Sequence, residues 1–156
     1  MHRNLKEMLK AKEKNTQLPE SQAKKTHLLA EARRYLDNAK DTLKPIPILE
    51  NVIYADVKYV AKAAGIAYLA ALKTIDAYLF GIGKIQSLKE KPKSIDGYYK
   101  VVSEMSFGNK MYPRLQSVYN SLHLNAYYKE DTNVDNIKGG FRVVKEMIEI
   151  IEGSGK

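Results

Sequence analysis

Apolar residues recur at steps of three and four along most of this chain, which is the period of an amphipathic α-helix. No segment alternates apolar and polar residues in the way that a half-buried β-strand does. The pattern predicts helices over residues 2–14, 20–44, from 49 or 54 to 81 or 83, 95–105, 110–128 and 134–152. We therefore predict an all-α protein, an antiparallel up-and-down bundle of four to five helices with a basic N-terminal arm.

Turn and capping residues place the boundaries of these helices. Pro19 suits a first helical turn, and Pro45 and Pro47 end the same helix. Ser94 is a predicted N-cap, and residues 131–133 are predicted to cap the last helix. The 156 residues divide into an arm or frayed helix over residues 1–18 and a single domain over 19–153.

Two glycines and one long apolar stretch modify this picture. Gly139 and Gly140 lie inside the last helix, where they predict a close packing contact or a local bend. Residues 65–83 come closest to a membrane span, but Lys73 and Asp76 interrupt them, so we predict a buried core helix and no membrane. The N-terminus lacks the apolar run of a signal peptide, and a cytoplasmic location is the expectation.

The net charge of +8 is concentrated in two segments. Residues 1–25 carry seven basic and three acidic side chains, and residues 84–93 carry four and one, leaving +1 for the rest. The candidate interaction residues in the second segment are Lys84, Lys89, Lys91 and Lys93. The arm and this loop could contact nucleic acid or an acidic protein, although solvated surface lysines are the commoner explanation.

Candidate chemistry gathers on the helix predicted over residues 110–128. At about 100° per residue, Tyr119, Asn120, His123 and Tyr127 form a polar stripe beside an apolar one. Hydrogen bonds from Tyr119 and Asn120 could set the tautomer of His123. One interpretation is a general acid/base or ligand histidine, and the other is a structural network of paired polar groups at a helix interface.

Residues 76–83, and residues 119–123 followed by Tyr127 and Tyr128, resemble the HEPN superfamily of helical bundles over about residues 26–152. Its catalytic members are metal-independent ribonucleases in which an arginine precedes a histidine by four to six residues, often with a polar residue after the arginine. Asn120 and His123 match the polar residue and the histidine, but Tyr119 stands nearest to the arginine's position.

Arg114 precedes His123 by nine residues, which puts the two on nearly opposite helix faces. The resemblance therefore implies a non-enzymatic binding module, self-associating as a homodimer, with Tyr127 and Tyr128 as candidate interface residues. The alternative is a divergent endoribonuclease with His123 as acid/base, in which Arg33, Arg34 or a partner chain would have to supply the cation.

Other chemistries find little in the sequence. The chain has no cysteine, which excludes disulfides, thiolate nucleophiles and cysteine-ligated metals. Neither His27 nor His123 follows a glutamate at the three-residue spacing of di-iron bundles. Phosphate-binding and dinucleotide-binding glycine motifs are absent from the sequence, so we expect no cofactor and no metal.

Overall fold

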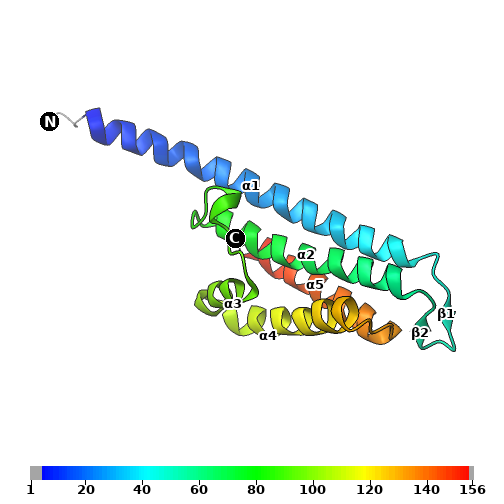
Figure 1. Cartoon of the computed structure of the whole chain (residues 1–156). Coiled ribbons are helices and arrows are strands. Elements are labelled where there is room, and N and C mark those ends of the chain that lie inside the picture. The colour runs from blue at the N-terminus through cyan, green and yellow to red at the C-terminus, as the bar shows by residue number, and fades with distance from the viewer. Residues whose placement is uncertain (1–4, 155–156) are drawn as a thin grey trace.

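The computed structural model describes the backbone of residues 5–154 and the side chains of Leu5 and residues 20–154. In chain order, the elements are α1 (Leu5–Leu43), β1 (Ile48–Leu49), β2 (Ile53–Tyr54), α2 (Val57–Gly81), the 3-10 helix η1 (Leu88–Glu90), α3 (Ile95–Glu104), α4 (Gly108–Val118), the π-helix η2 (Tyr119–Tyr128) and α5 (Val134–Gly153) (Figure 1). The predicted all-α helical bundle is confirmed.

Helix α2 is the centre of the bundle. It packs against α1 on one side and against η2 and α5 on the other (Figure 1). The face toward its neighbours is built largely from small residues, all fully buried: Ala63, Ala64, Ala67, Ala70 and Ala71. Small side chains let the helix axes approach closely. Helix α2 is also long and apolar enough to cross a membrane, but 67% of its most apolar window is buried inside the bundle.

Helix α1 runs without interruption from Leu5 to Leu43, so the helix boundary predicted at Pro19 is wrong. A proline inside a helix costs about 3 kcal/mol, and strong helix-forming residues on both sides of it can offset that cost. The predicted basic arm, residues 1–18, falls mostly outside the described side chains.

A two-stranded hairpin joins α1 to α2, where we expected no strand. Glu50 and Asn51 have positive φ angles, as the residues of a tight hairpin turn do. The last connection holds the hairpin in place: the Tyr54 amide donates to the Thr132 carbonyl at 3.0 Å, and the Val134 amide to the Val52 carbonyl at 2.8 Å. Because these strands have two residues each, they are too short to show an alternating pattern.

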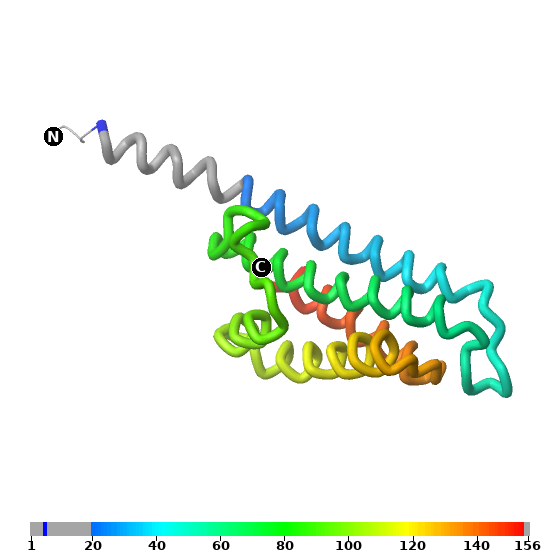
Figure 2. The backbone as a smooth tube through the Cα atoms, viewed as in Figure 1, coloured from blue at the N-terminus to red at the C-terminus, as the bar shows by residue number. Residues whose placement is uncertain are grey.

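The predicted helix caps are largely confirmed. Ser94 accepts a hydrogen bond from the Gly97 amide at the start of α3, and Asn133 accepts one from the Asn136 amide at the start of α5. Helix α2 begins later than predicted, because Asp56 caps it by accepting from the Lys58 and Tyr59 amides. The loop after α2 lies at the opposite end of the bundle from the hairpin (Figure 2).

The helix predicted over residues 110–128 is two elements. An α-helix runs as far as Val118, and a π-helix continues to Tyr128. The predicted apolar stripe is buried in both parts, at Leu115, Val118, Leu122 and Ala126. π-Helices are rare, usually short and often found at functional sites. Residues 119–128 are therefore a candidate location for a functional site.

The adjacent glycines Gly139 and Gly140 of α5 have different surroundings. A Cβ added to Gly140 would lie 2.6 Å from Leu122 Cδ2, whereas a Cβ on Gly139 would meet nothing within 4 Å. Gly140 therefore permits the close approach of α5 to η2, which is the first of the two alternatives, a packing contact or a bend, that the sequence left open.

Candidate functional site

Six aromatic side chains form a continuous row across one side of the bundle. We call this row the aromatic ladder; its members are Tyr68, Tyr99, Tyr112, Tyr119, His123 and Tyr127. They come from α2, α3, α4 and η2, so four separate elements position them.

His123 lies in the middle of the ladder. Its ring stacks on Tyr68 with centroids 4.7 Å apart, on Tyr119 at 5.3 Å and on Tyr127 at 5.9 Å. The interplanar angles are 23°, 28° and 11°. Such offset stacking places each ring within the favourable range for aromatic pairs, so ring packing orients the imidazole.

The hydrogen bonds predicted for His123 are not seen. Among the side chains that the structure describes, neither Tyr119 nor Asn120 is hydrogen-bonded to it, and Asn120 is exposed. The spacing correctly placed Tyr119 and Tyr127 beside His123, but it did not find Tyr68 or Tyr99. Those two come from other helices, and one sequence carries no signal for that proximity.

The ladder passes from half-buried rings to exposed ones. Burial raises the pKa of Tyr68 to about 12, with smaller effects from Tyr119 and Tyr99, so its hydroxyl stays protonated at neutral pH. Tyr127 is 50% exposed, its neighbour Tyr128 75%, and Tyr112 40%. The row therefore offers tyrosine rings and hydroxyls to solvent at both ends.

The described arginines are engaged elsewhere. Arg114 donates to Glu146 of α5 at 3.0 Å, and Arg33 makes a two-pronged contact with Glu152 at 2.6 and 2.7 Å. Helix α1, which carries Arg33 and Arg34, lies across α2 from η2 (Figure 1). Arg142, a residue of α5, lines a separate pocket between α5 and α1. Within residues 20–154, therefore, the structure offers no arginine to a phosphate at His123.

The lysines of residues 84–93 do not form one basic surface. Lys84 pairs with Glu104 at 3.8 Å, and Lys91 lies 4.0 Å from the buried carboxylate of Asp76. Lys89 and Lys93 form no ion pair with any residue that the structure describes. Two of the four predicted interaction lysines are thus partly neutralised within the chain.

A buried polar pair lies behind this loop. Asp76 is only 2% exposed, and the Tyr98 hydroxyl donates to its Oδ1 at 2.8 Å. Burial raises the pKa of Asp76, while the hydrogen bond from Tyr98 and the charge of Lys91 act in the opposite direction. This pair fastens α3 to α2, and it is not open to a substrate.

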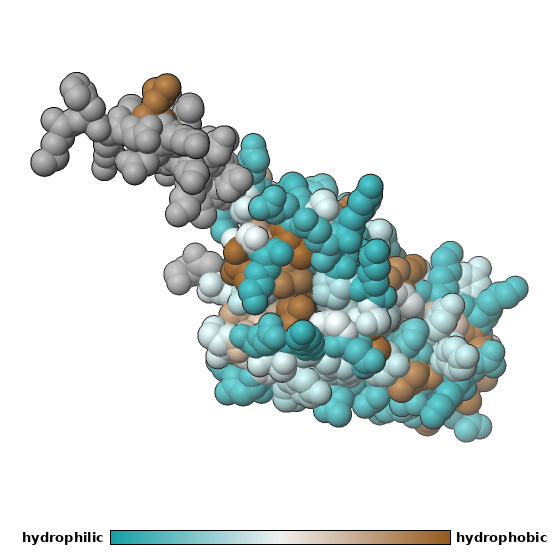
Figure 3. Space-filling view, turned by 60° about the vertical axis from the view of Figure 1, so that its left-hand side comes forward, coloured by the Kyte–Doolittle hydropathy of each residue, from teal (hydrophilic) through white to brown (hydrophobic). Residues whose placement is uncertain are grey.

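Apolar side chains are exposed among charged ones near the end of the bundle that carries this loop (Figure 3). A groove of about 590 Å³ lies between α1 and the loop, lined by Leu28, Phe80 and Leu88 with His27, Glu31 and Lys73. Three of its titratable groups pair with one another, since Glu31 contacts Lys73 at 3.2 Å and His27 at 3.6 Å. Lys24, which also lines the groove, donates to the Gln86 carbonyl at 3.0 Å.

Metal chemistry finds no support in the described part of the chain. There, no group of three or more His, Cys, Asp or Glu side chains is arranged to hold an ion. The ladder can stack, donate and accept hydrogen bonds, but none of its six members is an arginine or a lysine that would bring a permanent positive charge to a developing negative one.

The fold and the ladder define a small helical-bundle protein with an aromatic surface site. The chain belongs to the family described as a domain of unknown function, DUF5618, which matches residues 27–153. A solved structure of a protein of unknown function from Dyadobacter fermentans is similar to it, with 29% identity and a TM-score of 0.70 over 85% of this chain and 98% of that one. No curated protein matches the sequence.

Proposed function

We propose that this protein is a non-enzymatic, HEPN-like interaction module that self-associates through the aromatic ladder. The observation that carries the proposal is the stacking of tyrosines around His123, in a row that ends in the exposed ring of Tyr127 beside the exposed Tyr128. Tyrosine is enriched at protein interfaces, because its ring buries apolar area while its hydroxyl pairs with polar groups.

The ladder is suited to an interface because much of it is already ordered. His123 stacks on Tyr68 and Tyr119 packs against the same ring at a tilt of 51°. The ring of Tyr127 lies against Gly65, whose added Cβ would be 3.5 Å from it. Rings held in place in the free protein lose little conformational freedom on binding. A second copy that presents the same surface would meet it about a two-fold axis.

The HEPN-like part of the proposal has support from the His123 segment, and the ribonuclease alternative has less. A ribonuclease needs a base for the 2′-hydroxyl and a cation for the phosphate. His123 could supply the first, but the described arginines are engaged or lie elsewhere. The exposed Lys89 and Lys93 remain candidates for an acidic partner or nucleic acid.

Sedimentation velocity over a concentration series tests self-association. We expect a dimer that Tyr127→Ser combined with Tyr128→Ser weakens by at least tenfold, about the effect of losing one interface hot spot. Tyr59→Ser removes a tyrosine that is exposed on α2 outside the ladder, and it should leave the association unchanged. A wild-type protein that stays monomeric, or a double variant that associates like wild type, would contradict the proposal.

Incubation with an end-labelled mixed RNA pool, without metal, separates the module from the nuclease. We expect no cleavage by wild-type protein. The matched variant, His123→Leu, keeps an apolar side chain in the stack, so it should stay folded. Cleavage that disappears in the folded His123→Leu protein would establish the ribonuclease instead.

A further inference from the structure

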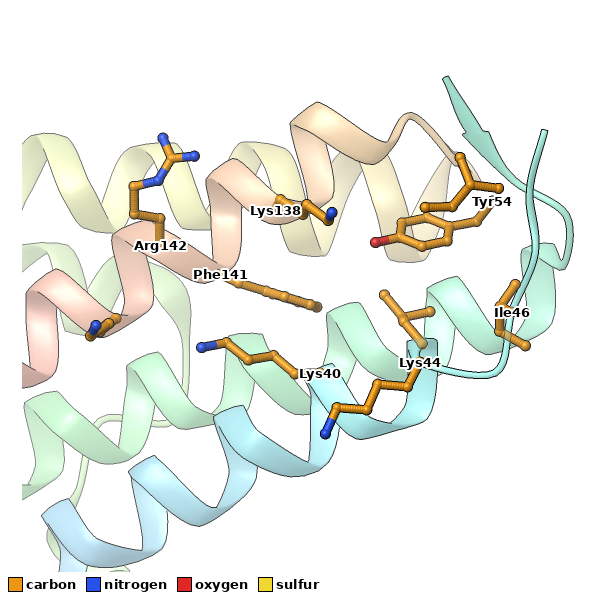
Figure 4. A pocket seen from close by; sticks show the side chains of 10 residues that line it. Lys40, Lys44, Ile46, Tyr54, Lys138, Phe141 and Arg142 are labelled. Atoms are coloured by element: carbon orange, nitrogen blue, oxygen red, sulfur yellow. The ribbon is translucent and has the colours of Figure 1, made fainter. Parts of the chain in front are cut away.

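A second site lies on the other side of the bundle, between α1, α5 and the hairpin. It is a pocket of about 460 Å³, within the range of small-molecule sites. Five of its lining residues are cations, Lys40 and Lys44 of α1 and Lys138, Arg142 and Lys145 of α5, and none is acidic. Lys40 and Lys44 on α1 lie across from Lys138 and Arg142 on α5 (Figure 4).

The floor of the pocket is apolar. Tyr54 and Phe141 point into it (Figure 4), Leu43 completes it, and Ile48 of the hairpin forms part of the rim. Tyr54, Phe141 and Leu43 are almost fully buried, so they present only the edge of the core to the pocket. A concave apolar surface with convergent charges suits a small ligand better than an extended polymer, because buried rings offer no platform on which bases could stack.

Most of the cations that line this pocket form no ion pair within the described part of the chain. Several cations elsewhere in the bundle pair with a carboxylate on another element, as in Arg33–Glu152, Arg114–Glu146 and Lys73–Glu31. In the pocket, Lys44 pairs with Asp41 at 2.7 Å, whereas the other four cations form no ion pair with any described residue. Like charges four residues apart on a helix repel each other, so this arrangement lowers stability unless an anion occupies it.

We propose that this pocket binds a free small molecule that consists of a phosphate monoester and a short aliphatic body. Arg142 would grip the phosphate with its planar fork of donors, and the flexible lysines would add charge. The aliphatic part would cover the apolar floor formed by Leu43, Tyr54 and Phe141. This site is independent of the aromatic ladder and of self-association.

Isothermal titration calorimetry with octyl phosphate as the probe tests the site. We expect octyl phosphate to bind at least about tenfold more tightly than inorganic phosphate, because each buried methylene adds affinity. Octyl glucoside, which has the same tail without the charge, should bind at least about tenfold more weakly. Equal affinity for octyl phosphate and inorganic phosphate, or no binding of octyl phosphate, would overturn the proposal.

Two double variants test whether octyl phosphate binds in this pocket. Lys138→Gln combined with Arg142→Gln should weaken octyl phosphate binding at least about tenfold. The control, Lys100→Gln combined with Lys110→Gln, removes the same charge from exposed positions on α3 and α4 and should change the affinity by less than about twofold. Equal losses in the two double variants would mean non-specific attraction by net charge, which overturns the site.

Ile48→Ser tests the apolar part, since Ile48 is an exposed rim residue whose loss should leave the protein folded. The substitution should weaken the binding of octyl phosphate and leave the binding of inorganic phosphate unchanged.

Vesicles that contain phosphatidic acid test whether the phosphate and the aliphatic body could instead belong to a membrane lipid. Binding to vesicles without binding to monomeric octyl phosphate would overturn the assignment to a free small molecule.

Discussion

Single residues acquire their chemistry from their neighbours in this bundle. In the sequence, Asp76 interrupts an apolar stretch. In the structure, its carboxylate is buried and accepts one hydrogen bond, from the Tyr98 hydroxyl. An ionised carboxylate in such a place is costly unless it is paired, and Lys91 lies at the limit of pairing distance. The pKa of Asp76 is accordingly raised above its ordinary value of 3.8.

A raised carboxyl pKa makes a prediction about stability and pH. The folded protein binds this proton more tightly than the unfolded chain, so the contribution of Asp76 is fully present below its ordinary pKa and is lost as pH rises through the folded pKa. Asp76→Asn keeps an acceptor for Tyr98 but does not titrate. Relative to this variant, wild type should gain stability as pH falls from neutral toward 4, as measured by urea unfolding.

The opposite trend would contradict that assignment. If wild type loses stability relative to Asp76→Asn on acidification, then Lys91 and Tyr98 stabilise the ionised form and the folded pKa lies below the ordinary one. Lys91→Gln would identify the contribution of Lys91, because this substitution removes the only cation that pairs with Asp76 within the described residues.

At the scale of the element, α5 contains a matched pair of glycines that the sequence could not rank. Both cost helix stability relative to alanine, but only Gly140 lies against a fully buried side chain, Leu122. The tertiary contact therefore decides which of the two can be replaced.

We expect Gly140→Ala to destabilise the protein by about 1–3 kcal/mol, because Leu122 must move within a filled core. Gly139→Ala should stabilise it by up to about 1 kcal/mol through helix propensity. Thermal and urea unfolding of the two variants measure both effects. A destabilised Gly139→Ala, or a neutral Gly140→Ala, would show that α5 and η2 pack less closely than described.

Helix periods and caps could be predicted because they depend on residues within a few positions of one another. The caps Ser94 and Asn133 and the buried stripe through Leu115 and Leu122 are of this kind. The hairpin was missed because hydrogen bonds to Thr132 and from Val134, far away in the chain, hold it. The π-helical continuation after Val118 was missed because the apolar residues there, Val118, Leu122 and Ala126, are four apart and also fit an α-helix.

At the scale of the molecule, the distribution of charge in space differs from its distribution along the chain. The sequence directed attention to residues 84–93, where Lys84 and Lys91 have partners in the fold. The unpaired cations around the pocket come from two helices, and acidic residues lie among them in the sequence. A count of charges along the chain therefore does not reveal the local excess of positive charge. The spacing of Lys138, Arg142 and Lys145 on one face of α5 was the available signal.

This arrangement predicts a stability effect in the absence of ligand. Lys138→Gln combined with Arg142→Gln should raise the free energy of unfolding at low salt by roughly 0.2–0.5 kcal/mol, because it removes a like-charge pair four residues apart. The gain should shrink as salt screens the repulsion. Thermal unfolding at low and high ionic strength measures it, and a destabilised double variant would mean that these cations have stabilising partners.

The sequence by itself determined the helical class, most helix ends and the placing of His123 between Tyr119 and Tyr127, because all of these follow from side chains close together in the chain. Tertiary structure alone decided that Tyr68 stacks on that histidine and that Tyr99 packs against Tyr119. It also decided that the described arginines lie elsewhere and that cations from α1 and α5 share one pocket. These features depend on how helices distant in sequence cross, and that is set by packing of the whole core.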